Sequence, residues 1–262
     1  MMRALYTAAT GMQAQQLNMD VISNNLANVN TTGFKRSRAD FQDLLYQEMK
    51  PAGTTVAQGS TRPTGLEVGL GVKPGSTETM FDQGVFQNTG NQLDVAIQGN
   101  GFYKVLLPDG TSAYTRDGAF KMDKDGKLVN TDGMAVQPEI NIPANATNVA
   151  VGSDGTVSVT IPGQQNPSKI GQIMLTTFAN PAGLQHLGGN NFKDTGASGA
   201  ASDVTPGTEG SGTLSQGVLE MSNVQIVQEM VNMITAQRAY EVNSKAITTA
   251  DSMLSTANNL IH

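Results

Sequence analysis

The side chains that could support catalysis in this sequence are few and lie far apart. Its only histidines are His186 and His262, and the second is the last residue of the chain. A hydrolase centred on His186 would need a nucleophile on a sharp strand-to-helix turn, and no such turn accompanies it in the loop-like stretch 184–191. The chain has no cysteine, which excludes disulfides, thiolate chemistry and cysteine-based zinc sites. We interpret His186 as a histidine of a surface loop.

Two motifs resemble metal or phosphate sites but lack a required part. The run 123–126, Asp-Lys-Asp-Gly, resembles the opening of a calcium loop, yet the position that needs glutamate is occupied by Met134. The Gly-x-Gly pairs at 69–71 and 99–101 are not followed by a helical pattern, so neither is interpreted as a phosphate-binding loop. We therefore expect no catalytic residue, no cofactor and no metal site, and a hairpin turn at 123–126.

Charge and hydropathy narrow the class of protein further. The net charge of −6 and the pI of about 4.9 argue against nucleic-acid binding, and we interpret the basic cluster Lys35, Arg36 and Arg38 as a local contact or a solvated face. No run of 18 apolar residues is present, so we expect no membrane span. The N-terminus lacks the apolar core of a signal peptide, which predicts a cytoplasmic chain or one exported without a cleaved signal peptide.

Only 15% of the residues are charged, and small polar residues replace charge along much of the surface. A surface that is poor in charge suits a protein covered by other proteins, because the cores of interfaces are depleted of charge. A secreted β-protein can share this composition.

The elements that would organise the molecule lie at its two ends. The stretch 222–262 contains no Gly and no Pro and predicts one long helix, with Ser222 and Gln225 forming a capping box at its start. At 1.5 Å per residue this helix would be ~60 Å long, so it needs a partner along its length. Its apolar seam follows a seven-residue repeat. The seam comprises Val242, Ile247, Met253, Leu254 and Ile261.

A matching seam lies at the N-terminus. The stretch 2–28 predicts an amphipathic helix that ends before Gly33. Its seam comprises Leu5, Met12, Met19, Ile22 and Leu26. We infer that the two terminal helices pair with each other, either parallel or antiparallel. In the alternative, each helix covers a face of the central domain, since short heptad runs also occur in ordinary core packing.

The middle of the chain predicts β-structure. Residues 34–50 have mixed periodicity that fits helix or strand, and 51–79 are so rich in Gly, Thr and Pro that we expect an extended arm or long hairpin. From 93 onward, short β-rich runs alternate with Asp-Gly pairs, which favour tight hairpin turns. These pairs begin at Asp109, Asp117, Asp125, Asp132 and Asp154. We expect a folded antiparallel β-core near 90–210 and, in a monomer, disordered ends.

Long motifs at both ends point to a known family. The N-terminal motif is SNNLANVNTTGFK at 23–35, and the C-terminal motif combines EMV at 229–231, AQRAYE at 236–241 and NSK at 243–245. LDVAIQGNGF, YTRDGAF and ANPAGLQHLGGNNF lie between them, at 93–102, 114–120 and 179–192. With these motifs the chain resembles, over nearly its whole length, the bacterial flagellar rod and hook axial proteins. The signature residues are Asn24, Asn25, Leu26, Asn28, Gly33, Phe34, Gln237, Arg238, Tyr240, Glu241 and Asn243.

The resemblance implies a structural subunit that assembles with itself into a helical tube. The length and the Gly/Pro-rich arm are most similar to those of distal rod members; proximal rod members of similar size, and the longer hook members, are the alternatives. It implies the basal body and its periplasm-spanning rod as the location, with export by the flagellar type III apparatus. Implied partners are proximal rod proteins, the hook protein and the surrounding ring, or bushing, proteins. A rigid tube of this kind would transmit torque from motor to hook and enclose the export channel.

These inferences predict an α+β fold with three parts. The parts are a coiled-coil-like assembly domain from 1–33 with 218–262, an extended arm or long hairpin at 34–88, and an inserted antiparallel β-domain at 89–217. We further expect the arm from about 46 to 74 to wedge between neighbouring subunits and stiffen the tube; a plain surface loop is the alternative. Two other classes remain open, namely a β-domain adhesin on a helical stalk and a hydrolase centred on His186.

Overall fold

The computed structural model describes residues 2–53, 55–57, 60–61, 63–163, 166–208 and 210–259. The chain divides into two compact units, which are treated separately. Unit 1 comprises Met1–Leu26, Ser37–Glu78 and Gln225–His262, and unit 2 comprises Ala27–Arg36 and Thr79–Val224. The chain therefore passes from one unit to the other at four points. The predicted α+β class, with a helix at each end and antiparallel strands between them, is confirmed.

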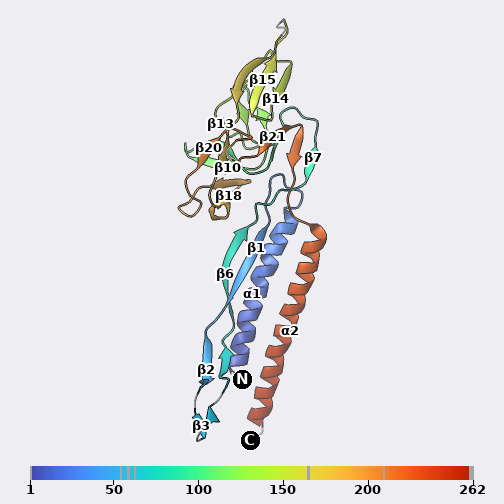
Figure 1. Cartoon of the computed structure of the whole chain (residues 1–262). Coiled ribbons are helices and arrows are strands. Elements are labelled where there is room, and N and C mark those ends of the chain that lie inside the picture. The colour runs from blue at the N-terminus through green and yellow to red at the C-terminus, as the bar shows by residue number, and fades with distance from the viewer. Residues whose placement is uncertain are drawn as a thin grey trace. The chain divides into compact units, whose positions relative to one another are not determined.

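Unit 1 contains the two long helices. Helix α1 (Met2–Ala27) has 26 residues and ends close to its predicted limit, and helix α2 (Ile226–Asn259) has 34. The helices run antiparallel, with the start of α1 and the end of α2 at the same end of the pair (Figure 1). Among the described residues, neither helix carries an apolar stretch long enough to cross a membrane.

Helix α2 begins four residues later than the capping box predicted. The hydroxyl of Ser222 accepts a hydrogen bond from the amide of Val224 at 3.3 Å, which is a local turn and not a helix cap. The next side chain, Asn223, accepts from the amide of Arg36 and donates to the carbonyl of Met80, both at 2.8 Å. These contacts hold 222–224 in a non-helical conformation, and the predicted start at Ser222 is wrong.

The remainder of unit 1 is a long hairpin built from nested antiparallel pairs. Strand β1 (Ser37–Asp43) pairs with β6 (Val72–Thr79), β2 (Tyr46–Lys50) with β5 (Leu66–Gly69), and β3 (Thr55–Ala57) with β4 (Ser60–Thr61). The ambiguous stretch 34–50 is thus strand over most of its length. Gly71, at φ 121°, allows the hairpin to approach Thr10 of α1, where a Cβ would collide with the threonine hydroxyl.

Unit 2 is made of short antiparallel strands around a five-stranded sheet. The order in that sheet is β13 (Val136–Gln137), β9 (Tyr103–Leu106), β10 (Ser112–Thr115), β19 (Asn191–Lys193) and β18 (Gln185–Gly188). A three-stranded sheet has the order β14 (Asn148–Val151), β15 (Thr156–Thr160) and β16 (Ser168–Gln172).

Four two-stranded pairs complete unit 2. They are β7 (Phe86–Asn88) with β22 (Val218–Glu220), β8 (Val95–Gln98) with β21 (Thr213–Gln216), β11 (Lys121–Met122) with β12 (Leu128–Val129), and β17 (Leu175–Thr177) with β20 (Ser202–Val204). A short 3₁₀ turn, η1 (Pro181–Gly183), precedes β18.

The core of unit 2 lies among these strands and has two parts. The larger cluster includes Ile97, Tyr103, Val105, Val159, Ile173 and Leu175, each no more than 1% exposed. The smaller is aromatic and comprises Phe102, Tyr114, Leu184 and Phe192, with Phe81 and Phe178 packed against it in edge-to-face contacts. Alternating burial along β15 matches the period-2 pattern of a half-buried strand.

Most Asp-Gly pairs form the expected turns. Gly110, Gly126 and Gly155 have φ of 81–82° and lie in the turns that follow β9, β11 and β14. The pair Asp117-Gly118 is an exception, because Gly118 lies against the backbone of Val95 and its carbonyl accepts the Val95 amide at 3.0 Å. The prediction of a hairpin turn there is wrong.

One further expectation is corrected. The stretch 184–191, predicted as loop, contains β18 and the start of β19, whose register is shifted by a bulge near Gly188. The compact unit that contains the predicted β-core near 90–210 also includes 27–36, 79–89 and 211–224. Strand β8 in the core pairs with β21, which lies beyond 210.

Candidate functional site

The seam of α1 lies on a partly covered face of unit 1. Ile22 is 4% exposed, and the other four seam residues of this helix are partly buried. On α2, Ile247 and Leu254 are partly buried, whereas Val242 and Met253 are 65% and 56% exposed. Ile261 lies outside the described residues. The ten predicted seam residues thus include both covered positions and positions that face outward in one copy of the chain.

The two helices approach each other closely at a signature residue. A Cβ added to Gly11 of α1 would lie 3.0 Å from the side-chain nitrogen of Asn243 on α2. Ala236 and Ala250 are also buried on α2, at the same seven-residue spacing as Asn243. Small residues at a repeating position allow close helix packing. This line of α2, and not the predicted Val242 and Met253, faces inward within unit 1.

A second face of α2 is apolar and uncovered by the described residues. It is formed at the N-terminal end of the helix by Ile226, Val227, Met230, Val231 and Ile234, which are 48–76% exposed. We call these five residues the apolar stripe. Their spacing of one, three and four residues places them on one side of the helix. Contiguous exposed apolar surface on a helix is typical of an interaction site.

The C-terminal signature continues along the exposed part of α2. Gln237, Arg238 and Glu241 are exposed, and Tyr240 is 38% exposed. Arg238 and Glu241 form a surface ion pair at 3.4 Å, with side chains 78% and 56% exposed. Such pairs contribute little to stability. These side chains are therefore available for contacts outside the single chain.

The N-terminal signature is held together by hydrogen bonds. Asn25 is 2% exposed, and its amide donates to the carbonyl of Ser37 at 2.8 Å while its oxygen accepts from the Ser37 amide at 2.9 Å. This two-fold bond joins the end of α1 to the start of β1 as a strand partner would. Gly33 has φ 67° and lies so close to Asp117 that a Cβ would be 2.7 Å from its amide nitrogen. Asn28 accepts from the hydroxyl of Thr31 at 3.2 Å.

The remaining signature side chains of the N-terminus are less enclosed. Asn24 is exposed, and Leu26 and Phe34 are partly buried.

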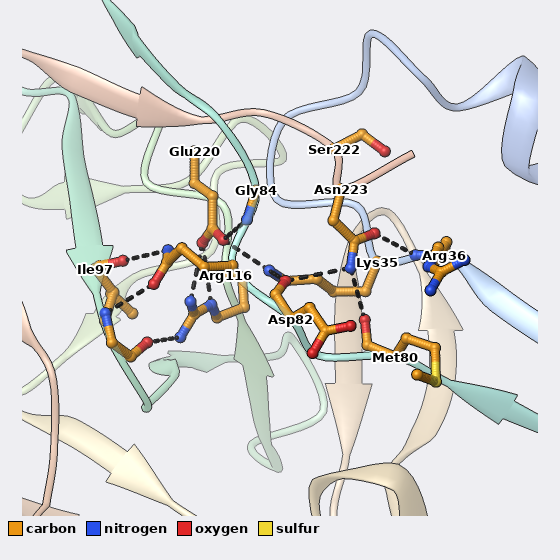
Figure 2. A network of polar contacts seen from close by, with 12 residues as sticks. Lys35, Arg36, Met80, Asp82, Gly84, Ile97, Arg116, Glu220, Ser222 and Asn223 are labelled. Carbon is orange, nitrogen blue, oxygen red and sulfur yellow. Dashed lines mark hydrogen bonds and ion pairs between the residues drawn. The ribbon is translucent and has the colours of Figure 1, made fainter. Parts of the chain in front are cut away.

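Sequence reasoning missed a buried charged network in unit 2 (Figure 2). Glu220, at the end of β22, is 1% exposed, and its carboxylate pairs with Lys35 at 2.6 Å and with Arg116 at 3.0 Å. Lys35 is itself 1% exposed, so of the two alternatives for the basic cluster, a local contact or a solvated face, the solvated face is wrong for Lys35. Arg38, by contrast, is exposed and pairs with Asp40 and Glu78.

The network brings two cations to one buried carboxylate. Burial lowers the pKa of Lys35 below its usual value, and the guanidinium of Arg116 lowers it further. The Glu220 carboxylate opposes both effects, and the nearby Asp82 carboxylate also raises the pKa of Lys35. Arg116 is also bound through its other terminal nitrogen to the carbonyls of Gly99 and Gly101, at 2.8 and 2.7 Å. A signal was present in the sequence, since a single glutamate interrupts the apolar run 218–221.

Of the two histidines considered for catalysis, His262 lies outside the described residues. His186 lies on β18, packs against the ring of Phe192 at 4.7 Å and contacts the hydroxyl of Thr79 at 2.9 Å. Burial lowers its pKa. The run 123–126 forms a tight turn in which the Gly126 amide donates to the Asp123 carbonyl at 2.9 Å. Within the part of the chain that the structure describes, no group of His, Asp or Glu side chains could hold a metal ion.

Comparison with known proteins gives matches along the chain. Residues 5–35 match the family model "flagella basal body rod protein", residues 96–159 the "flagellar hook protein FlgE/F/G D1 domain", and residues 215–260 the "flagellar basal body rod FlgEFG protein C-terminal". These segments contain α1 with the N-terminal signature, much of the β-unit, and β22 with α2.

Full-length relatives are similarly close. The chain is 54% identical over 262 residues to the flagellar basal-body rod protein FlgG of Borreliella burgdorferi, with 99% of each chain covered. It is 54% identical to the protein of the same name from Buchnera aphidicola subsp. Schizaphis graminum, covering 97% of this chain and 98% of that one. It is 52% identical to the FlgG of Caulobacter vibrioides, with 99% of each chain covered.

Proposed function

The chain belongs to the family of flagellar basal-body rod proteins, and we propose that it is a distal rod subunit that polymerises into a rigid tube. The observation that carries this proposal is the identity of 50% or more to rod proteins named FlgG over nearly the full length. The location is accordingly the flagellar basal body. The role is structural, and we propose that the chain has no catalytic activity.

The apolar stripe of α2 supports polymerisation as the means by which the subunit works. Five apolar side chains on one helix face, each about half exposed or more, favour burial against another molecule. The exposed signature residues at 237–241 lie directly after this stripe. We propose that a second copy of the chain covers both. The predicted seam residues that face outward, Val242 and Met253, extend the same proposed interface.

The finer aspects of the function are also proposals. The tube transmits torque from the motor to the hook and encloses the export channel. Its ends meet proximal rod proteins and the hook protein, and its outer surface meets the ring proteins that act as a bushing. The rod spans the periplasm, and the chain reaches it through the flagellar type III apparatus without a cleaved signal peptide. The division into 1–33 with 218–262, 34–88 and 89–217 likewise stays a prediction.

The experiment uses the full chain and a substitution on the apolar stripe. We expect wild-type protein at high concentration to form tubes in electron micrographs, and Val231→Asp to remain monomeric with an unchanged melting profile. The matched control is Gln228→Asp, which adds the same charge at an exposed polar position of the same helix, three residues before Val231. Tubes formed equally well by Val231→Asp would contradict the role of the stripe. Failure of the wild-type chain to form any ordered polymer would contradict self-assembly.

A further inference from the structure

The buried network of unit 2 joins parts of the chain that are far apart in sequence. Lys35 and Glu220 are separated by 185 positions, and Arg116 and Glu220 by 104. The Glu220 carboxylate also accepts from the amide of Gly84 at 2.9 Å, and its backbone carbonyl accepts from the amide of Gly33 at 2.8 Å. Four segments of unit 2 therefore meet at one side chain.

The same segments are tied together around Glu220 by further bonds. Lys35 donates to the carbonyl of Asp82 at 2.7 Å, and the amide of Met221 donates to Val85 at 2.9 Å. The side chain of Asn223 bridges the backbones of Arg36 and Met80 (Figure 2). Three of the four points at which the chain enters or leaves unit 2 lie next to these bonds, after 36, before 79 and after 224.

The segment 218–223 also fits closely against residues 84–86. The backbone of Gly84 lies against the carbonyl of Met221 so closely that any Cβ would collide with it. Strand β22 pairs with β7 in the same place, with Glu220 opposite Phe86.

The two cations of this site need the Glu220 carboxylate as their partner. Lys35 and Arg116 bring two cations to a buried position, and Glu220 is the anion bound directly to both. Its carboxylate accepts from Lys35, from Gly84 and twice from Arg116, which fills the acceptor capacity of a carboxylate. Removing one partner of a buried pair is far more costly than the pair itself is stabilising, because the other charge stays buried and unpaired.

We propose that Lys35, Arg116 and Glu220 form a charge lock that makes closure of unit 2 conditional on the segment 218–223. Residues 33–36 and 80–85 adopt their native positions only when Glu220 is seated between the two cations. The segment before α2 therefore fixes the conformation of two earlier segments that lead into unit 1. The lock is a conformational device of this chain, and it does not depend on the proposed role in a polymer.

The test uses three variants of the full chain in a denaturant titration. We expect Glu220→Gln, which preserves size but removes the charge, to raise the unfolding equilibrium constant of unit 2 by about 10²–10⁴-fold. Lys35→Met added to Glu220→Gln should recover at least tenfold of that loss, because one unpaired cation is then removed. The matched control is Glu139→Gln, whose partner Lys127 lies at a similar distance of 2.8 Å but with both side chains exposed, and which should change the constant by less than about fivefold.

Hydrogen exchange can show whether Glu220 holds several segments together or stabilises only its own. In Glu220→Gln, amides of 33–36, 80–85 and 218–223 should lose protection together, while those of β9 and β10 retain theirs. Three results would overturn the proposal: a loss of protection confined to 218–223, a change in the unfolding constant below tenfold, or a further loss of stability when Lys35→Met is added. If Glu220→Gln does not fold, folding of the double variant supports the lock, and its failure to fold refutes it.

Discussion

Substitution of Asn25 should separate the end of α1 from the start of β1. The side chain is 2% exposed and makes two short hydrogen bonds to the backbone of Ser37. Each bond is worth about 1 kcal/mol net, and the Ser37 groups left without a partner add to the loss. We therefore expect Asn25→Ala to destabilise unit 1 by about 2–3 kcal/mol.

Asn25→Asp provides the sharper test of the same geometry. An ionised carboxylate can still accept from the Ser37 amide, but its second oxygen would face the Ser37 carbonyl in place of a donor. At neutral pH the deficit should therefore equal or exceed that of Asn25→Ala. Burial beside the Ser37 carbonyl raises the pKa of this carboxyl above its usual range. On acidification it becomes protonated and can donate again, so the deficit should shrink relative to the alanine variant at the same pH.

The assay is hydrogen exchange at the last turn of α1 and at β1, together with denaturant melting followed by far-ultraviolet circular dichroism. Gln16→Ala, on an exposed position of the same helix, is the control and should melt as the wild type does. The reasoning is refuted if Asn25→Ala leaves exchange at β1 unchanged. It is also refuted if Asn25→Asp is as stable as the wild type at neutral pH.

Three further predictions concern other parts of the chain. Leu254→Asp or Met19→Asp should block rod completion in cells without changing the melting of unit 2. The reason is that burying a carboxylate in an apolar seam costs roughly several kcal/mol. Normal rods in either variant would show that the seam is not needed for assembly. Shortening the arm within 46–74 should give tubes that still form but bend in electron micrographs. Straight tubes from the shortened chain would show that the arm is only a surface loop. His186 should titrate below 6.5 in an NMR experiment, since burial lowers its pKa. Unit 2 should then lose stability as pH falls below about 6.5, because the unfolded chain binds the proton first; loss of this pH dependence in His186→Asn is the control.

The elements that could be predicted are those whose signal is local and repeated. The seven-residue repeats predicted both helices, the absence of Gly and Pro supported the C-terminal one, and the Asp-Gly pairs predicted the turns at 109, 125 and 154. The start of α2 was not predictable in this way. Ser222 fits a capping box on composition alone, but the bonds of Asn223 to Arg36 and Met80 hold the segment out of the helix. Those partners are about 140 to 190 positions away, so no local pattern records them.

The burial of Lys35 is a second feature that local sequence patterns could not predict. Lys35 stands beside Arg36 and near Arg38, and a basic run of this kind usually forms a solvated face. Arg38 behaves in that way, whereas Lys35 is enclosed by Glu220 from the opposite end of the sequence. A lone glutamate within 218–221 was a visible anomaly, but its partners could only be found once the strands were placed.

The signature residues divide according to what they contact, and this division bears on how the chain works. Asn25 is buried and binds the backbone of Ser37 within unit 1, and Gly33 packs against Asp117 within unit 2, so the identity of both is explained within one molecule. Gln237, Arg238 and Glu241 are exposed on α2, and the one ion pair among them contributes little to stability in water. Side chains that contribute little to the fold of the single chain can contribute to binding when a second surface covers them and excludes water. We therefore expect the N-terminal motif to fix the subunit's own geometry, and we propose that the C-terminal motif presents a surface for neighbouring subunits.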